Sequence, residues 1–156
     1  MDSDPIIITF ICTGNTCRSP MAEFLMRKLL ADHHLTTIEV QSAGIAPAAE
    51  LEFPEEARLA LADEGVIAIR HHAKPLTNDM ASSSHLILTM EKRHLDWVQK
   101  RFPEAKKKTY LLTDYAGLNK EEIEDPYGQS LATYKKILAQ IKEALVRLAE
   151  KLKTAH

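Results

Sequence analysis

Two cysteines, an arginine and a serine stand close together near the start of the chain. They belong to the segment CTGNTCRS, which runs from Cys12 to Ser19 and directly follows the apolar run IIITFI. A cysteine thiolate is a nucleophile, and the planar guanidinium of Arg18 presents a fork of donors that fits two oxygens of a phosphate. These residue types at this spacing indicate a site that holds an oxyanion against a cysteine sulfur.

The residues on either side of this segment predict how it is positioned. Residues 6–12 are mostly β-branched, which is typical of a strand covered on both faces in a parallel sheet. A helix is expected from about Arg18, because Pro20 suits a first helical turn. In an open α/β sheet, ligands gather at the carboxyl ends of the strands, where the loop after the first strand turns its amides toward them. Cys12 occupies that place.

The rest of the sequence alternates between strand and helix patterns. Further strands are expected at residues 37–42, 84–90 and 108–112, with a turn at Ala43-Gly44, and helices at 54–65, 91–102 and 130–152. The alternation predicts an α/β fold with a parallel sheet of four strands. The polar connection between the fourth strand and the last helix is long enough to suggest a functional loop. The leucine stripe of the last helix is interpreted as core packing rather than a coiled-coil seam.

The composition bounds the class of protein. The chain has 156 residues, 45% of them hydrophobic, which suffices for one core, so a single domain over residues 1–156 is expected. A net charge of −2 provides no basic field for nucleic acid or an anionic membrane. No apolar stretch approaches the ~20 residues that span a bilayer, and the N-terminus lacks the cationic start of a secretory signal. The expected location is the cytoplasm.

The loop after the first strand has the composition of an anion cradle. The free amides of the loop and of the first helical turn, with the positive end of the helix dipole, favour a bound phosphate and a thiolate. Gly14 and Asn15 tolerate the positive φ that such a loop requires, and Ser19 can donate its hydroxyl to the sulfur. The pattern predicts phosphoryl transfer to Cys12, with phosphorus in line with the thiolate.

Phosphoryl transfer also needs an acid for the leaving group. Asp125 is the candidate, because it lies in the polar connection after the last strand, at the same edge of the sheet, with Pro126 restricting its backbone. The same carboxylate can then activate water against the cysteinyl-phosphate. Other carboxylates on this connection remain rivals that composition does not separate from it: Asp114, Glu121, Glu122 and Glu124.

Other phosphate or metal sites fit the sequence poorly. The chain has neither the GxxxxGK[ST] phosphate loop nor the GxGxxG dinucleotide fingerprint. Cys12 and Cys17 are spaced C-x4-C without a second pair, whereas zinc sites have four ligands, so no metal or cofactor is expected. Cys17 is equally consistent with a buried packing residue at the helix start.

Three motifs in order resemble the low-molecular-weight protein-tyrosine-phosphatases: C-x5-R-S at the end of the first strand, S-A-G after the second, and D-P-aromatic before the last helix. The resemblance covers essentially the whole chain, and CTGNTCRSPMAE is its most specific part. It implies a three-layer α/β sandwich with flavodoxin-like topology, and hydrolysis of phosphorylated proteins through a cysteinyl-phosphate. In that scheme Cys12 is the nucleophile, Arg18 clamps the phosphate and the transition state, and Asp125 is general acid and then base.

The resemblance also implies which residues bind phosphate and support the loop. The phosphate-binding residues would be Thr13, Gly14, Asn15, Thr16, Cys17, Arg18 and Ser19. Asn15 and Ser19 would also join Ser42 and His71 in a buried hydrogen-bond network that holds the loop and tunes the thiol. His72 is the alternative to His71, and the spacing to the PLT segment that follows favours His71.

Two residues bear on the substrate. The position of Thr16 is commonly isoleucine in members specific for phosphotyrosine, whereas a threonine resembles the bacterial protein-arginine-phosphatase branch. Its hydroxyl can contact a guanidinium or the attacked phosphoramidate, where isoleucine would pack against an aryl ring. Tyr127 is expected to form a wall of the cleft by itself, because no second aromatic residue directly follows it. The resemblance therefore favours phosphoarginine over phosphotyrosine in a protein substrate, and the enzyme is expected to be a monomer.

Two other classes of protein compete with this interpretation. Arsenate reductases have a similar fold and loop, but the thioredoxin-coupled kind needs further cysteines outside the loop, and this chain has none. A phosphate-binding module without activity would usually have lost Cys12 or Arg18, and both are present. A compatible hypothesis is redox control, in which Cys17 traps oxidised Cys12 as a disulfide.

Overall fold

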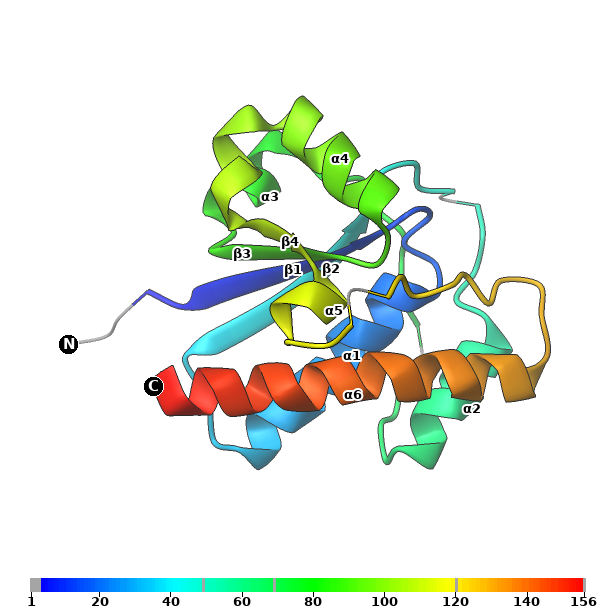
Figure 1. Ribbon diagram of the computed structural model, residues 1–156. Coiled ribbons are helices and arrows are strands. Elements are labelled where there is room, and N and C mark those ends of the chain that lie inside the picture. The colour runs from blue at the N-terminus through cyan, green and yellow to red at the C-terminus, as the bar shows by residue number, and fades with distance from the viewer. Residues whose placement is uncertain (1–3, 49, 69, 120, 156) are drawn as a thin grey trace.

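The computed structural model describes residues 4–48, 50–68, 70–119 and 121–155. Its elements follow one another along the chain as Figure 1 shows: β1 (Ile6–Cys12), α1 (Arg18–Asp32), β2 (Ile38–Gly44), α2 (Glu55–Asp63), α3 (Asn78–Ser83), β3 (Leu86–Thr89), α4 (Lys92–Arg101), the 3₁₀ helix η1 (Pro103–Lys108), β4 (Thr109–Leu111), α5 (Leu112–Tyr115) and α6 (Leu131–Ala155). The predicted order of strands and long helices is confirmed.

The four strands form one parallel sheet in the order β2-β1-β3-β4. β1 pairs with both β2 and β3, and its last residue, Cys12, lies beside Gly44, the last residue of β2. The chain passes from β1 to β2 on one side and then returns past β1 to form β3 and β4 on its other side. Such a reversal opens a crevice at the carboxyl ends of the two central strands. Cys12 therefore ends a strand at the place where ligands bind in this class of fold.

Helices cover both faces of the sheet, which makes three layers (Figure 1). α1 and α6 lie on one face, and α3 and α4 lie on the other. Alternate residues of β1 supply the two cores, because successive side chains of a strand point to opposite faces. Ile8 and Phe10 pack with α1 and α6, whereas Ile11 packs with Val98 of α4. The predicted α/β sandwich is confirmed.

The last helix is part of the core, as its leucine stripe predicts. Its buried residues recur at steps of three and four, and they include Tyr134, Leu138, Ile141, Leu145 and Leu148. The helix packs against α1 and α2. The stripe is therefore core packing.

Some local predictions are wrong. Ala43 and Gly44, expected to turn, continue β2, because β1 and β2 stay paired as far as Cys12. The predicted polar connection begins with the short helix α5, and the sequence pattern predicts neither α3 nor η1. These helices have four to six residues, which is too short to show an apolar period.

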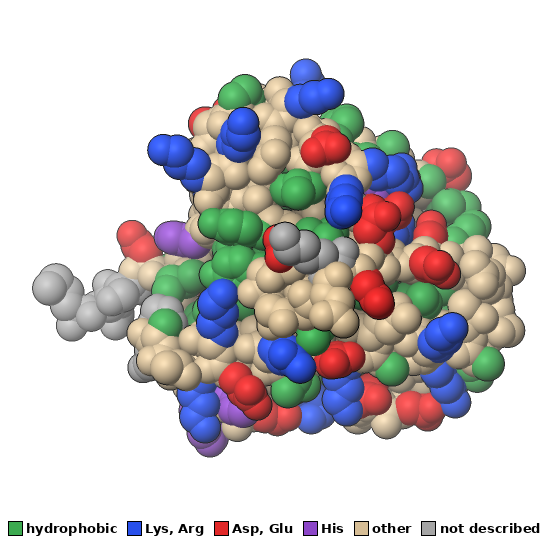
Figure 2. Space-filling model, viewed as in Figure 1, with side chains coloured by type: hydrophobic (Ala, Val, Ile, Leu, Met, Phe, Trp, Pro, Cys, Tyr) green, Lys and Arg blue, Asp and Glu red, His purple; other side chains and the backbone are tan. Residues whose placement is uncertain are grey.

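The surface carries both signs of charge. Acidic and basic side chains are interspersed over the face in Figure 2, as the small net charge leads one to expect. Within the described ranges, no helix combines the length and the apolar character that crossing a membrane requires.

Candidate active site

Cys12 lies at the floor of the loop between β1 and α1. Its side chain is 2% exposed, and its Sγ lies 2.9 Å from Ser19 Oγ. Ser19 belongs to the first turn of α1, a 15-residue helix, so the sulfur lies at the positive end of a helix dipole. A hydroxyl that donates to the sulfur favours the thiolate in the same way. The structure therefore brings the predicted nucleophile and the predicted hydroxyl donor together.

Two positions let the loop curl. Asn15 has a φ of 53°, in the left-handed region that asparagine tolerates. Behind the loop, Gly44 has no room for a side chain, since a Cβ there would lie 2.7 Å from the Thr13 carbonyl oxygen and 3.0 Å from the Asn15 amide nitrogen. The S-A-G motif thus places a residue without a side chain where the loop crosses the end of β2.

Asn15 is the centre of a buried network behind the loop. Its Nδ2 donates to Ser19 Oγ and to Ser42 Oγ, at 2.9 Å in each case. Its Oδ1 accepts from the backbone N–H of Lys74 at 3.0 Å, and Ser42 donates to Glu23 Oε1 at 2.6 Å. Asn15, Ser19 and Ser42 are fully buried. The structure joins these three predicted residues and adds Glu23, which sequence reasoning missed.

His71, rather than His72, reaches this network. His71 Nε2 lies 3.0 Å from the side-chain oxygen and 3.0 Å from the backbone oxygen of Asn15, so this nitrogen carries a hydrogen and donates. Burial lowers the pKa of His71, and the nearby carboxylate of Glu23 only partly opposes this effect. The ring is therefore neutral at pH 7. His72 is exposed.

Arg18 is buried on the other side of the loop. Its side chain is 1% exposed, and its Nη1 donates to Glu91 Oε2 at 2.5 Å and to the Ile123 carbonyl oxygen at 2.6 Å. A buried guanidinium needs a partner of opposite charge, and Glu91 supplies it from the start of α4. Sequence reasoning missed Glu91. The available signal was its place just after β3, because the ends of parallel strands meet at one edge of the sheet.

Glu91 also holds a second arginine. Arg93 Nε donates to Glu91 Oε1 at 3.1 Å, and the Arg93 side chain is largely exposed. Burial by itself would raise the pKa of Glu91, but the hydrogen bonds from Arg93 and Arg18 outweigh burial and bring that pKa below its usual value. Glu91 is therefore ionised at neutral pH and holds Arg18 as an ion pair.

A cleft of about 210 Å³ opens over the loop. The described residues that line it are Cys12, Thr13, Gly14, Thr16, Cys17, Arg18, Ala46, Ala48, Leu51, Asp125 and Tyr127. Asp125 Oδ2 lies 3.8 Å from Arg18 Nη2, and the Asp125 side chain is 48% exposed. Its Oδ1 accepts from the backbone N–H of Tyr127 at 3.1 Å, which orients the carboxylate. Of the five carboxylates proposed as the acid, Asp125 is the one that lines the cleft in the described part of the chain.

The two residues expected to bear on the substrate, Thr16 and Tyr127, both line this cleft. Thr16 is 6% exposed, and its hydroxyl donates to the Gly14 carbonyl oxygen at 3.2 Å. Tyr127 is half-exposed at the rim. The apolar residues Ala46, Ala48 and Leu51 supply a further part of the wall.

Cys17 has a different environment from Cys12, although both are buried free thiols. Cys17 Sγ lies 3.4 Å from the hydroxyl of Tyr134 on α6. Burial raises the pKa of Cys17 to about 12, so this thiol is protonated at neutral pH and is a poor nucleophile. A redox role for Cys17 stays a prediction.

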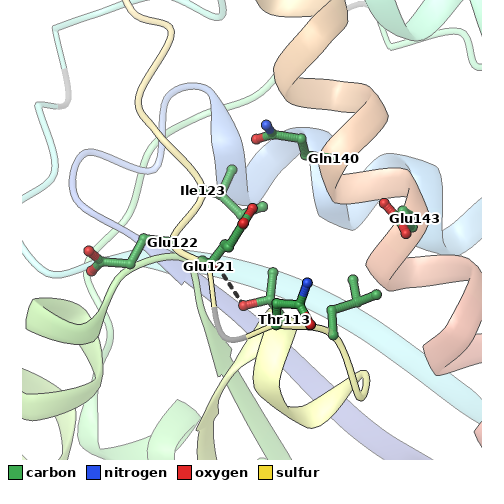
Figure 3. Close-up of a pocket in the computed structure, with 8 residues that line it drawn as sticks. Thr113, Glu121, Glu122, Ile123, Gln140 and Glu143 are labelled. Carbon is green, nitrogen blue, oxygen red and sulfur yellow. Dashed lines mark hydrogen bonds between the residues drawn. The ribbon is translucent and has the colours of Figure 1, made fainter.

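The segment that carries Asp125 is braced at its start. Thr113 Oγ1 donates to the Glu121 carbonyl oxygen at 2.6 Å. Figure 3 shows this bond beside a pocket of about 110 Å³ between the segment and α6, with Ile123 at the pocket and Glu122 pointing away from α6. None of the described residues that line this pocket also lines the cleft over the cysteine, so the two spaces are separate.

Comparison with known proteins agrees with this geometry. The chain matches the family model for low molecular weight phosphotyrosine protein phosphatases over residues 7–156. It is 37% identical over 150 residues to a protein-arginine-phosphatase of Geobacillus stearothermophilus, covering 96% of this chain and 98% of that protein. It is 34% identical over 145 residues to the low molecular weight protein-tyrosine-phosphatase Etp of Escherichia coli (strain K12), covering 93% of each.

A solved structure shows the same fold. A mutant of the YwlE arginine phosphatase with a phosphorylated active-site serine superposes with a TM-score of 0.89 and 32% sequence identity, covering 95% of this chain and 96% of that one. The matches extend over nearly the whole chain and include the strand ends that form the cleft. The chain therefore belongs to the low molecular weight phosphotyrosine protein phosphatase family, and it is a hydrolase.

Proposed function

We propose that this protein removes phosphoryl groups from proteins through a cysteinyl-phosphate, with phosphoarginine as the favoured substrate. The observation that carries the proposal is a single cleft in which Cys12 Sγ lies 2.9 Å from Ser19 Oγ while Arg18 and Asp125 line the same space. A nucleophile, a cationic clamp and an acid then surround one phosphoryl group.

In the first step, the Cys12 thiolate attacks phosphorus in line with the leaving nitrogen. An S–P bond forms as the P–N bond breaks, and the nitrogen takes the proton of the Asp125 carboxyl group. Arg18 and the loop amides stabilise the negative charge on the phosphoryl oxygens. The products of this step are the dephosphorylated arginine residue of the substrate protein and the cysteinyl-phosphate of the enzyme.

In the second step, water hydrolyses the cysteinyl-phosphate. The water oxygen bonds to phosphorus as the S–P bond breaks, and Asp125, now a carboxylate, takes a proton from that water. The thiolate of Cys12 is restored, and inorganic phosphate leaves. The hydroxyl of Ser19 stabilises the sulfur both before the attack and as it departs.

Phosphoarginine is favoured by the wall of the cleft. The hydroxyl of Thr16 donates its hydrogen to Gly14, so its oxygen keeps lone pairs that can accept from a guanidinium N–H. An isoleucine at this position would offer no acceptor. The similarity to a relative named as a protein-arginine-phosphatase supports the same choice.

Phosphotyrosine is the second candidate substrate. The half-exposed ring of Tyr127 and the apolar side chain of Leu51 border the cleft, and both could pack against an aryl ring. The similarity to a relative named as a protein-tyrosine-phosphatase supports this alternative. The chemical steps are the same, except that a P–O bond breaks.

The ratio of kcat/KM values on matched phosphopeptides separates the two substrates. The peptides differ only in carrying phosphoarginine or phosphotyrosine, and the parent protein is expected to prefer phosphoarginine. Thr16→Ile should shift the ratio toward phosphotyrosine, whereas Thr16→Ser, which keeps the hydroxyl, should preserve the direction of the preference. A parent that prefers phosphotyrosine would contradict the proposed substrate, and a ratio unchanged in Thr16→Ile would remove Thr16 as its cause.

We also propose that residues 1–156 form one phosphatase domain that acts as a monomer in the cytoplasm, without a metal or cofactor and without nucleic acid. The family match over residues 7–156 and the small net charge support this proposal. Light scattering of the purified chain is expected to give the mass of a single copy.

A further inference from the structure

Three side-chain nitrogen atoms lie near the side-chain oxygen of Thr13. Arg93 Nη2 lies 2.6 Å from Thr13 Oγ1, His94 Nε2 lies 2.9 Å from it, and Arg18 Nη2 lies 3.4 Å from it. Both arginines can only donate. The direction of the Thr13 hydroxyl therefore depends on the tautomer of His94.

The second nitrogen of His94 fixes that tautomer. His94 is fully buried, and its Nδ1 accepts from the backbone N–H of Glu91 at 3.1 Å, so Nδ1 carries no hydrogen. The hydrogen of the neutral ring is then on Nε2, which donates to Thr13 Oγ1. Burial, together with the charges of Arg18 and Arg93, lowers the pKa of His94 to about 4 although Glu91 opposes them, which agrees with a neutral ring.

The oxygen of Thr13 is thus occupied as an acceptor. The two closer donors, Arg93 and His94, take its two lone pairs, and Arg18 Nη2 lies at the longer distance of 3.4 Å. The hydrogen of the Thr13 hydroxyl has no acceptor among the described residues. Thr13 lines the cleft with Cys12 and Arg18, where the substrate phosphoryl group would lie. A hydroxyl hydrogen without a partner at such a place can donate a hydrogen bond to an anionic oxygen.

We propose that the Thr13 hydroxyl donates a hydrogen bond to a phosphoryl oxygen of the substrate, with His94 and Arg93 as the positioning residues that orient it. The proposal rests on the proposed function of the cleft and adds a side-chain contact to the loop amides. Because phosphoarginine and phosphotyrosine share the phosphoryl group, this contact acts on both. Thr13 therefore sets affinity for phosphate, whereas Thr16 sets the choice of leaving group.

Binding of inorganic phosphate to the full chain, measured by calorimetry, tests the hydroxyl directly. Thr13→Val keeps the shape of the side chain and removes its hydrogen bond, so the dissociation constant should rise by about tenfold or more. Thr13→Ser should recover most of the lost affinity. Thr9→Val is the matched control, since it removes a threonine hydroxyl from β1, which ends just before Thr13. The Thr9 hydroxyl lies 2.6 Å from that of Ser84 and away from the cleft, so the variant should leave phosphate binding unchanged.

A second pair of variants tests the positioning role of His94. In His94→Asn, the side chain can still accept from Glu91 but is too short to reach Thr13, so phosphate affinity should fall. His94→Gln is long enough to donate to Thr13 and should keep most of that affinity. His85→Gln is the control, because His85 Nδ1 also accepts a backbone N–H, from Ile7 at 3.0 Å, but lies outside the cleft.

The outcomes separate this proposal from the proposed function. If the parent binds phosphate and Thr13→Val binds it equally well, the hydroxyl contact is wrong and the phosphatase function stands. If the parent neither binds phosphate nor turns over a phosphopeptide, the function itself fails. Equal fold-losses in kcat/KM on phosphoarginine and phosphotyrosine peptides in Thr13→Val support the proposal, and a loss confined to one peptide contradicts it.

Discussion

The two sides of the phosphate loop are built from different chemistry. The rear network lies toward β2 and consists of Asn15, Ser19, Glu23, Ser42 and His71. The front network lies toward β3 and α4 and consists of Thr13, Arg18, Glu91, Arg93, His94 and Asp125. The rear residues are joined mainly by neutral amide and hydroxyl hydrogen bonds in a buried setting. The front pairs guanidinium groups with carboxylates and opens to solvent at its rim.

This difference separates two tasks. Buried neutral hydrogen bonds hold the loop in one shape whether or not a ligand is present, and leaving their partners unpaired costs stability. The charged groups act on the ligand, because they stabilise the charge that develops during phosphoryl transfer. Substitution of Asn15 in the rear network should therefore reduce stability more than rate, and substitution of the half-exposed Asp125 in the front network should reduce rate more than stability.

The largest effect is expected at Asp125. Asp125→Asn removes the proton donor of the front network, so kcat on a phosphopeptide should fall by roughly 10²–10⁴ while the melting temperature stays close to that of the parent. The loss should be smaller on p-nitrophenyl phosphate, whose leaving group needs little protonation. Glu124→Gln, one residue away on the same segment, is the control. An unchanged rate in Asp125→Asn would move the role of the acid to a neighbouring carboxylate.

Breaking the rear network should mainly affect folding. Asn15→Ala removes the bonds to Ser19, Ser42 and Lys74 and places alanine at a φ of 53°, so the free energy of unfolding should fall by about 3 kcal/mol. Urea unfolding measures the loss, with the exposed Asn78→Ala as the control. A large loss of kcat without any loss of stability would contradict the division between the two networks.

The pH dependence of stability reports the buried ring of the front network. The unfolded chain protonates His94 near its usual pKa of about 6.5, whereas burial and Arg18 lower the native pKa to about 4. Between these values the unfolded state binds more protons, so stability falls as pH decreases, by at most roughly 3 kcal/mol from this one residue. Urea unfolding between pH 7 and pH 4.5 should show this extra fall in the parent and not in His94→Gln, while His85→Gln should follow the parent. If the free energy of unfolding falls with pH equally in the parent and in His94→Gln, the His94 ring does not remain neutral in the folded protein over this pH range.

Sequence patterns predicted the parts of the site that are close together in the chain. The segment from Cys12 to Ser19 includes the nucleophile, the arginine and the loop, so its residue types and spacing were sufficient. The long apolar periods predicted the main strands and helices. The short helices α3 and α5 were missed because four to six residues show no period.

The members of the front network at the start of α4, Glu91, Arg93 and His94, could not be predicted in the same way. Arg18 and Glu91 are 73 residues apart, and Thr13 and His94 are 81 apart, so only the packing of β1 beside β3 brings them together. Glu91 and His94 look like an ordinary helix start, and they do form a capping box. Their second task becomes visible only when the loop lies against that helix.

The phosphoryl group of the substrate is expected to be transferred to the sulfur of Cys12 before it reaches water. Asp125→Asn can be mixed with p-nitrophenyl phosphate, whose leaving group needs little protonation, so that the variant mainly slows hydrolysis of the cysteinyl-phosphate. The protein is then quenched within one turnover, digested and examined by mass spectrometry. We expect one phosphoryl group, carried by the sulfur of Cys12, and none on the other residues of the loop. Release of inorganic phosphate at the parent rate from Cys12→Ser, or a phosphoryl group on any other residue of the loop, would contradict this expectation.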